Sequence, residues 1–125
     1  MEVQILEKQD GFVRVKSTIG SFYGTWCSST PIVAKKYIVE LDSDAVLTLD
    51  DVELSKCNKP SVKGTKGMTY VVGLVEEIEN SIIILRLQST IMMLEILPNL
   101  DFTQYLGRYI KISISDIVLY DVGIC

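Results

Sequence analysis

The chain has 125 residues, 48% of them hydrophobic, and 12 basic against 16 acidic side chains give a formal net charge of -4. A chain of this length commonly folds around one core that buries about two-thirds of the surface exposed by the unfolded state. It contains no histidine, which is the commonest general base and a common zinc ligand. We therefore expect one domain over residues 1–125 that is not an enzyme and has no catalytic residue, metal or cofactor.

Three cysteines and two sequence segments bear on the cellular location. Cys27, Cys57 and Cys125 are far apart and form no C-x-x-C pair, which is typical of reduced thiols in a cytosolic protein. The first residues lack the basic and then apolar segments of a secretory signal. The apolar run 82–85 ends at Arg86, whereas a membrane-spanning helix needs about 20 residues. These features predict a cytoplasmic protein without a membrane partner.

Alternation of apolar and polar side chains dominates the chain and predicts an all-β, mainly antiparallel fold. In the first half, strands are expected over residues 12–19, 21–26, 36–42 and 46–54. The first of these places Val13 and Val15 on one face, and Gly20 and Gly24 then interrupt the pattern. A turn at 42–44 separates the last two strands, and the second of them ends in acidic residues, as edge strands often do.

The segment 55–67, with the sequence SKCNKPSVKGTKG, has no apolar period and is predicted to be a basic loop. Loops of about a dozen residues are uncommon unless they are functional or disordered. Its four lysines are Lys56, Lys59, Lys63 and Lys66. They could hold phosphates, as OB-type barrels do with basic loops and stacking aromatics, or they could belong to a flexible solubilising loop.

In the second half, strands are expected over 68–78, 82–87 and 91–97, with a tight return at 79–81 that makes the first two a hairpin. One short helix is predicted near 99–106. Asn99 can cap it, Phe102, Tyr105 and Leu106 share one face, and Gly107 can end it. A last strand is expected over 109–115, and residues 117–122 are expected to extend it.

These elements amount to seven or eight strands and one short helix, without an internal repeat. We expect a single small barrel or sandwich over 1–125, with a basic loop at 55–67, and an OB-like five-stranded barrel fits the size. One detail disagrees with that fold. An OB barrel usually places its helix between the third and fourth strands, whereas here the helix would come just before the last strand.

Acidic residues gather in three clusters along the sequence: Glu40, Asp42 and Asp44, then Asp50, Asp51 and Glu53, then Glu76, Glu77 and Glu79. Their spacing matches no EF-hand loop, and no pair of glycosidase carboxylates can be recognised. They can form a solvated face with turns. They can also form a surface that attracts a basic protein and orients it during encounter.

Phe22, Tyr23 and Trp26 form an aromatic group beside two glycines. Exposed tryptophan and tyrosine are frequent hot spots of protein interfaces, but large aromatics also pack into barrel cores, and core packing is expected here. Ser28 has no base nearby in the sequence that could make it a nucleophile. Cys27 is expected to be a structural thiol.

Two segments carry a resemblance to a known group of proteins. Residues 26–42, WCSSTPIVAKKYIVELD, are similar to the pattern W-x-G-x-x-P-x-x-G-x-x-Y-x-V-E-L-D of small bacterial β-rich proteins. Ser28 and Ala34 stand where that pattern has glycine. Residues 106–112 and 117–121 are similar to the ending G-x-Y-V-x-I…I-x-L-Y-D of the same group. Such proteins resemble the immunity proteins of contact-dependent growth inhibition and related polymorphic toxin systems.

The resemblance implies a non-enzymatic bacterial immunity protein that binds and neutralises a cognate toxin domain. An acidic binder would suit a basic nuclease toxin, and a specific interface needs about 800 Å² from each partner. We place the partner-binding surface at Glu40, Asp42, Asp44, Asp50, Asp51 and Glu53. The alternative is an OB-type module that binds single-stranded nucleic acid through Lys56–Lys66, and a third hypothesis is a structural subunit without a site of its own.

Overall fold

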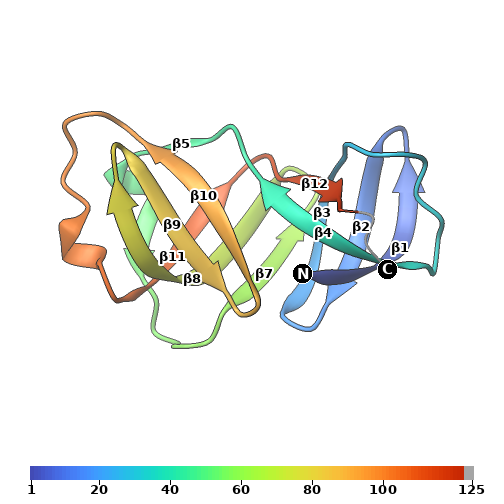
Figure 1. The fold of residues 1–125 in the computed structure, drawn as a ribbon, viewed down its shortest axis with the longest axis horizontal. Coiled ribbons are helices and arrows are strands. Elements are labelled where there is room, and N and C mark those ends of the chain that lie inside the picture. Colours follow the sequence, from blue (N-terminus) through green and yellow to red (C-terminus); the bar gives the residue numbers. More distant parts are fainter. Residues whose placement is uncertain (123–125) are drawn as a thin grey trace.

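A computed structural model describes residues 1–122 and confirms an all-β fold, with twelve strands and two short 3-10 helices in this range (Figure 1). The first half contains β1 (Glu2–Gln9), β2 (Phe12–Ser17), β3 (Gly20–Trp26), β4 (Lys36–Asp42), β5 (Val46–Leu47), the 3-10 helix η1 (Leu49–Asp51) and β6 (Val52–Leu54). The second half contains β7 (Ser61–Thr65), β8 (Met68–Glu79), β9 (Ile82–Leu87), β10 (Thr90–Ile96), the 3-10 helix η2 (Thr103–Tyr105), β11 (Tyr109–Ile114) and β12 (Val118–Asp121). No helix among these residues is long and apolar enough to cross a membrane.

The alternation of side chains decides which face of each strand is buried. In β2, Val13 and Val15 are buried while the residues between and beside them are not. In β11 the isoleucines Ile110, Ile112 and Ile114 are buried in the same way. Every inward face joins one continuous cluster of buried apolar residues. The free energy of burying this cluster holds the strands together, because strands this short are marginal alone.

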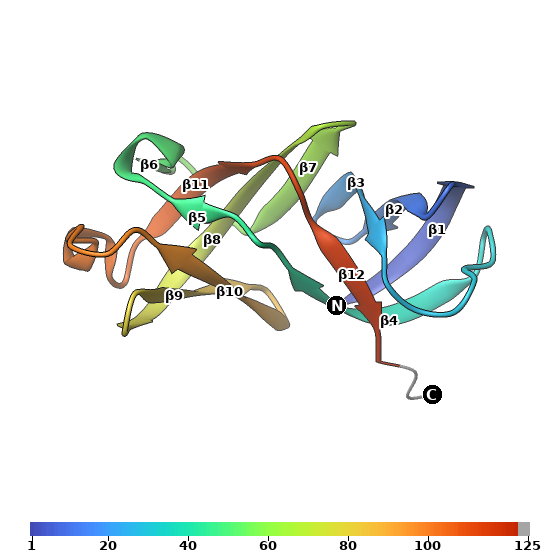
Figure 2. The ribbon, with the colours of Figure 1, turned by 90° about the horizontal axis from the view of Figure 1, so that it is seen from above.

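Strands β1, β2, β3, β12 and β4 form a closed barrel in this order, since β1 pairs with both β2 and β4. Its neighbouring strands are antiparallel, except that β12 runs parallel to β3. This strand order, with its one parallel pair, is that of an OB-type five-stranded barrel. Four of the strands come from the start of the chain, whereas β12 comes from the end of the described chain (Figures 1 and 2).

The remaining strands form a second sheet in the order β5-β10-β9-β8-β11-β6, and β7 pairs with the first part of β8. β5 and β6 lie at opposite ends of this order but are joined in the chain by η1 alone. The two ends of the sheet are therefore held near each other by one helical turn. The second sheet is not closed by a strand pairing, since β5 and β6 are linked by η1 and not by a ladder.

Strands β8 to β12 repeat the backbone path of β1 to β5, and we call these two sets the two halves. The offset is 70 residues over the first three strands and 72 or 73 at the last two. The β1–β2 ladder has a bulge after Ile5, and the β8–β9 ladder has a bulge after Val75. The first turn of each half begins with a residue in the left-handed region, Asp10 with φ 47° and Asn80 with φ 51°. The expectation that the chain has no internal repeat is therefore wrong at the level of the backbone.

The turn before the fourth strand also repeats. Ala34 has φ 71° and Gly107 has φ 76°. The Ala34 amide donates to the Ile5 carbonyl at 2.7 Å, and the Gly107 amide donates to the Val75 carbonyl at 2.9 Å. Both turns therefore dock on the bulge residue of their own half, which fixes where β4 and β11 begin.

The fifth strand of each half pairs with the third strand of the other half. β5 follows β4 of the first half but pairs in parallel with β10 of the second, and β12 follows β11 of the second half but pairs in parallel with β3 of the first. The contacts are equivalent, because the Leu97 amide donates to the Leu47 carbonyl and the Cys27 amide to the Leu119 carbonyl, both at 3.0 Å. The closed barrel therefore needs β12 from the second half, and the second sheet receives β5 from the first.

The halves also meet at β7 and at two equivalent turns. The Val62 amide donates to the Ile19 carbonyl at 3.0 Å, which ties β7 to the start of β3. The Thr18 hydroxyl donates to the Gln88 side-chain oxygen at 2.9 Å, and these two residues are themselves 70 apart. A Cβ atom on Gly20 would collide with the Val62 carbonyl oxygen, so glycine permits this close approach.

Several expected elements differ from the structure. The segment 55–67 is not a continuous loop, because residues 61–65 form β7, whose Val62 is fully buried against the core. Residues 117–122 do not extend β11, because the chain crosses to the other barrel as β12. Strand β1 was not anticipated, and 46–54 is divided into β5, η1 and β6.

The predicted helix near 99–106 is a single 3-10 turn, η2. Asn99 does not cap it, since it has a φ of 70°, and the Asp101 carboxylate instead accepts a hydrogen bond from the Thr103 amide at 2.9 Å. The turn lies between β10 and β11, which are the third and fourth strands of their half. Its position therefore agrees with an OB-type order, and the disagreement expected from the sequence disappears.

Candidate functional site

The six acidic residues assigned to a partner surface occupy separate places. Glu40 and Asp42 are exposed on the outer face of β4, and Asp44 is exposed in the link to β5. These three form one set near Tyr120, whose pKa is affected by both aspartates.

The second acidic set lies in and after η1. Asp50 is exposed, whereas the Asp51 carboxylate accepts hydrogen bonds from the Thr48 amide at 2.8 Å and the Thr48 hydroxyl at 3.0 Å. Glu53 lies on β6, with its carboxylate 4.0 Å from the Lys111 ammonium group. Asp51 is therefore engaged in shaping η1, and Glu53 belongs to a lysine-rich surface.

The first set borders a groove of about 400 Å³, which we call the Tyr120 groove. It is lined by Glu40, Leu41, Asp42, Thr90, Ile91, Met93 and Tyr120. Glu40 and Tyr120 are opposite each other in the β4–β12 ladder, and β10 contacts β4 from the other half. Figure 2 shows β4, β10 and β12 on the same side of the molecule. The groove thus forms where the two halves meet.

Its floor and rim combine apolar and acidic side chains. Ile91, Met93 and Tyr120 are 36%, 53% and 41% exposed, which is high for large apolar and aromatic side chains on a sheet. Glu40 and Asp42 form no ion pair with any described residue. A ligand with an apolar body and a cationic head would match both features.

The electrostatic potential at the groove is negative. The pKa of Tyr120 is raised above its ordinary value of 10.0, first by the negative charge that Cys27 carries when ionised, then by burial, and then by Asp42 and Asp44. A negative potential opposes ionisation of a phenol and attracts an external cation. Of these causes, the carboxylates of Asp42 and Asp44 are the charges that a basic partner would meet at neutral pH.

A second groove, of about 540 Å³, is lined by three of the four lysines of the predicted basic loop, and we call it the lysine groove. It is lined by Glu53, Leu54, Ser55, Lys56, Cys57, Lys59, Ser61, Lys63, Tyr70, Val72 and Lys111. Lys66, the fourth lysine of the loop, lines another groove. The fourth lysine of the lysine groove is Lys111 of β11.

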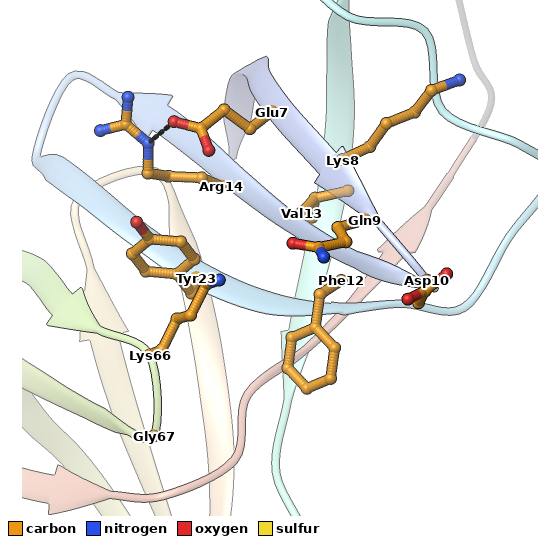
Figure 3. Close-up of a pocket in the computed structure, with 10 residues that line it drawn as sticks. All are labelled: Glu7, Lys8, Gln9, Asp10, Phe12, Val13, Arg14, Tyr23, Lys66 and Gly67. Atoms are coloured by element: carbon orange, nitrogen blue, oxygen red, sulfur yellow. Dashed lines mark hydrogen bonds and ion pairs between the residues drawn. The ribbon is translucent and has the colours of Figure 1, made fainter.

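A third groove, of about 340 Å³, lies on the outer face of β1 to β3 beside the β7–β8 turn (Figure 3). Arg14 and Tyr23 are opposite each other in the β2–β3 ladder, and Lys66 reaches toward the Tyr23 ring. The Arg14 guanidinium is paired with the Glu7 carboxylate at 3.0 Å. Because the charges along this groove are mixed and partly paired, it favours no class of ligand.

The aromatic group of the sequence is divided between core and surface. Phe22 and Trp26 are buried, as expected, whereas Tyr23 lines the third groove. Cys27 and Cys57 are exposed and contribute little to the core, and Cys125 lies outside the described residues. Among residues 1–122, no group of three Cys, Asp or Glu side chains is arranged to hold a metal ion.

Several groove residues were not found from the sequence. Ile91, Met93 and Tyr120 lie on strands predicted only as core elements, and Lys111 and Tyr70 lie outside the basic loop. Apart from Lys111, their common signal is an apolar or aromatic residue at an outward position of a strand. Without the pairing of the strands, such positions cannot be joined into a groove.

Comparison with protein-family models, with curated proteins and with solved structures found no match to the chain. The function must therefore be argued from the geometry and charge of the grooves.

Proposed function

We propose that the protein is a non-enzymatic inhibitor of the immunity-protein kind, which binds a toxin domain through the Tyr120 groove and neutralises it. The observation that supports this function is the combination, in one groove, of half-exposed apolar side chains with carboxylates that have no cationic partner in the described chain. Interfaces concentrate their binding energy in such apolar anchors, and charged neighbours orient the partner.

The partner that fits is a basic protein domain, and a nuclease toxin is the proposed class because its phosphate site carries lysine and arginine. Such a side chain can lay its aliphatic stem on Met93 and Ile91 while its cationic head meets Glu40 or Asp42. The acidic chain, with a net charge of -4, also speeds encounter with a basic domain. A toxin that acts inside the cell requires the inhibitor in the cytoplasm, which is the proposed location.

The proposal is tested by affinity capture of partners from the native cytosol, with quantitative mass spectrometry. Wild-type protein is compared with the double variant Glu40→Lys/Asp42→Lys. The matched control is Glu77→Lys/Glu79→Lys, which makes the same charge change at exposed positions of β8 outside the groove. We expect a basic toxin domain at a near-equal ratio with wild type and control, and a loss of at least about 30-fold with the groove variant, equivalent to about 2 kcal/mol.

A functional assay completes the test. Co-expression of the captured domain with wild type or control should restore growth, whereas co-expression with the groove variant should not. Equal retention of the toxin by all three proteins would contradict a role of the Tyr120 groove. Recovery of no basic protein by the wild type would contradict the inhibitor function itself.

A further inference from the structure

The lysine groove is a second candidate site, and its charge is opposite to that of the whole chain. Four of its lining residues are lysines and one is a glutamate, on a chain with a net charge of -4. The lysines come from three places: Lys56 and Lys59 from the segment after β6, Lys63 from β7 and Lys111 from β11. The groove shares no residue with the Tyr120 groove.

These ammonium groups are largely unneutralised. Lys56, Lys59 and Lys63 form no ion pair with any described residue. Lys111 approaches one carboxylate, that of Glu53, but only at 4.0 Å, and both side chains are well exposed. Gathering like charges in one hollow costs free energy through mutual repulsion, and an anionic ligand relieves it.

An aromatic ring lies among the lysines. Tyr70 of β8 is 44% exposed, which leaves much of its side chain accessible to a ligand. Lys63 is opposite it in the β7–β8 ladder, and the Lys111 ammonium group lies 5.2 Å from its ring centroid. Leu54, 48% exposed, adds an apolar surface at the same groove.

From this arrangement we infer that the lysine groove binds single-stranded nucleic acid, independently of the toxin. The ammonium groups meet successive phosphates, and a base stacks on Tyr70 beside Leu54. Positively charged grooves with aromatic platforms bind single strands in this way, without strong sequence preference. A carboxylate polymer or a free phosphate would use the lysines but would leave the exposed ring without a role.

The test measures the fluorescence anisotropy of a labelled oligothymidylate of about 12 nucleotides as the purified protein is added at low salt. Three to four phosphate contacts predict a slope of log affinity against log salt of about -2 to -3. Lys56→Glu/Lys59→Glu should weaken binding about 10-fold or more and flatten the slope. Tyr70→Ala should weaken binding about 5-fold or more without changing the slope, because stacking releases no counterions.

The matched control is Lys16→Glu/Lys36→Glu, which reverses two exposed lysines outside the lysine groove and should bind as the wild type does apart from a small effect of net charge. Thermal unfolding shows that each variant is folded. No binding at low salt would overturn the inference, as would equal losses in the groove and control variants. Competition by polyglutamate as strong as that by unlabelled oligonucleotide, with no effect of Tyr70→Ala, would assign the groove to acidic proteins instead.

Discussion

At the scale of the residue, the φ angles of Ala34 and Gly107 determine the conformational cost of two equivalent turns. Both stand in the turn before a fourth strand, with φ values of 71° and 76°. In this left-handed region a residue with a Cβ atom costs about 1 kcal/mol, whereas glycine adopts it freely. The β-rich immunity-type pattern has glycine at the position of Ala34, and the geometry gives a physical reason for that glycine.

Ala34→Gly should therefore raise the free energy of unfolding by about 0.5 kcal/mol, the relief of strain less the larger entropy of an unfolded glycine. Gly107→Ala should lower it by about 1 kcal/mol, because no atom lies within 4 Å of the new Cβ and only the φ angle opposes it. Urea denaturation of both variants measures these changes. The same sign for both would contradict the equivalence of the two turns.

Tyr120 gives a titration that reports the charge of its groove. Its pKa is raised, with Cys27 as the first cause and Asp42 among the others, so its phenol should ionise above its ordinary value of 10.0 in ultraviolet titration. Subtracting the curve of Tyr120→Phe isolates it. Cys27→Ser and Asp42→Asn should each lower this pKa, and an unchanged pKa in both would contradict a negative groove.

The sign of the linked stability follows from the direction of the shift. The folded protein holds the Tyr120 proton more tightly than the unfolded chain does. Its contribution to stability is therefore complete below the ordinary value of 10.0 and is lost as the pH rises through the folded pKa.

At the scale of the element, alternation predicts the strands that bury a regular face. The bounds of β4 follow directly from it, since Tyr37, Val39 and Leu41 share one face of the strand. It misses β7, where Val62 is the one buried apolar side chain in five residues and lysine and glycine surround it. That strand exists because β8 supplies a ladder and the Ile19 carbonyl, just before β3, accepts a hydrogen bond from Val62. Neither contact is visible in the local sequence.

Gly20→Ala tests the contact between β3 and β7. The new Cβ would meet the Val62 carbonyl oxygen, and the backbone has a φ of 139°, so we expect a loss of about 2–4 kcal/mol in the free energy of unfolding. Gly67→Ala is the control, because its φ of 93° adds strain but no atom lies within 4 Å. It should lose only about 1 kcal/mol. Chemical denaturation measures both free energies of unfolding. Equal losses in the two variants would contradict a steric clash between residue 20 and β7.

Sequence inspection found the acidic rim of the Tyr120 groove but not its apolar part, for a physical reason. Glu40 and Asp42 are neighbours on β4, whereas Met93 and Tyr120 come from β10 and β12. Each of those strands also carries buried residues, so its outward apolar positions look like core positions. Strands β4, β10 and β12 come together only because the two halves exchange strands.

At the scale of the whole molecule, the chain forms a closed five-stranded barrel and a second sheet that exchange one strand each. The amino-acid sequence shows no repeat, because the backbone path repeats while the side chains along it differ. Phe22 corresponds to Met92 and Gly24 to Leu94, all of them buried. Gly24 leaves space that Leu119 of β12 occupies, whereas the larger Leu94 stands at the equivalent position of the second half.

The exchange predicts that neither half folds alone. Cleavage of the chain in the exposed segment after Cys57 gives fragments 1–57 and 58–125. The first lacks β12 of the closed barrel, and the second lacks β5 of the second sheet. Each should be largely unfolded by circular dichroism, and mixing should restore the native spectrum in a 1:1 complex. A second fragment shortened to 58–117 lacks β12 and should fail to restore the first barrel. Cooperative folding of 1–57 by itself would contradict the exchange.

The most direct measurement of the proposed function is photocrosslinking from inside the Tyr120 groove. A photoreactive phenylalanine analogue replaces Met93, which is 53% exposed on the groove, and in a control protein it replaces Lys16 on the outer face of β2. After irradiation in native cytosol, we predict one basic toxin domain joined to position 93, through residues beside its active site, and none joined to position 16. Crosslinks of the same proteins at both positions, or none at position 93, would contradict inhibition through this groove.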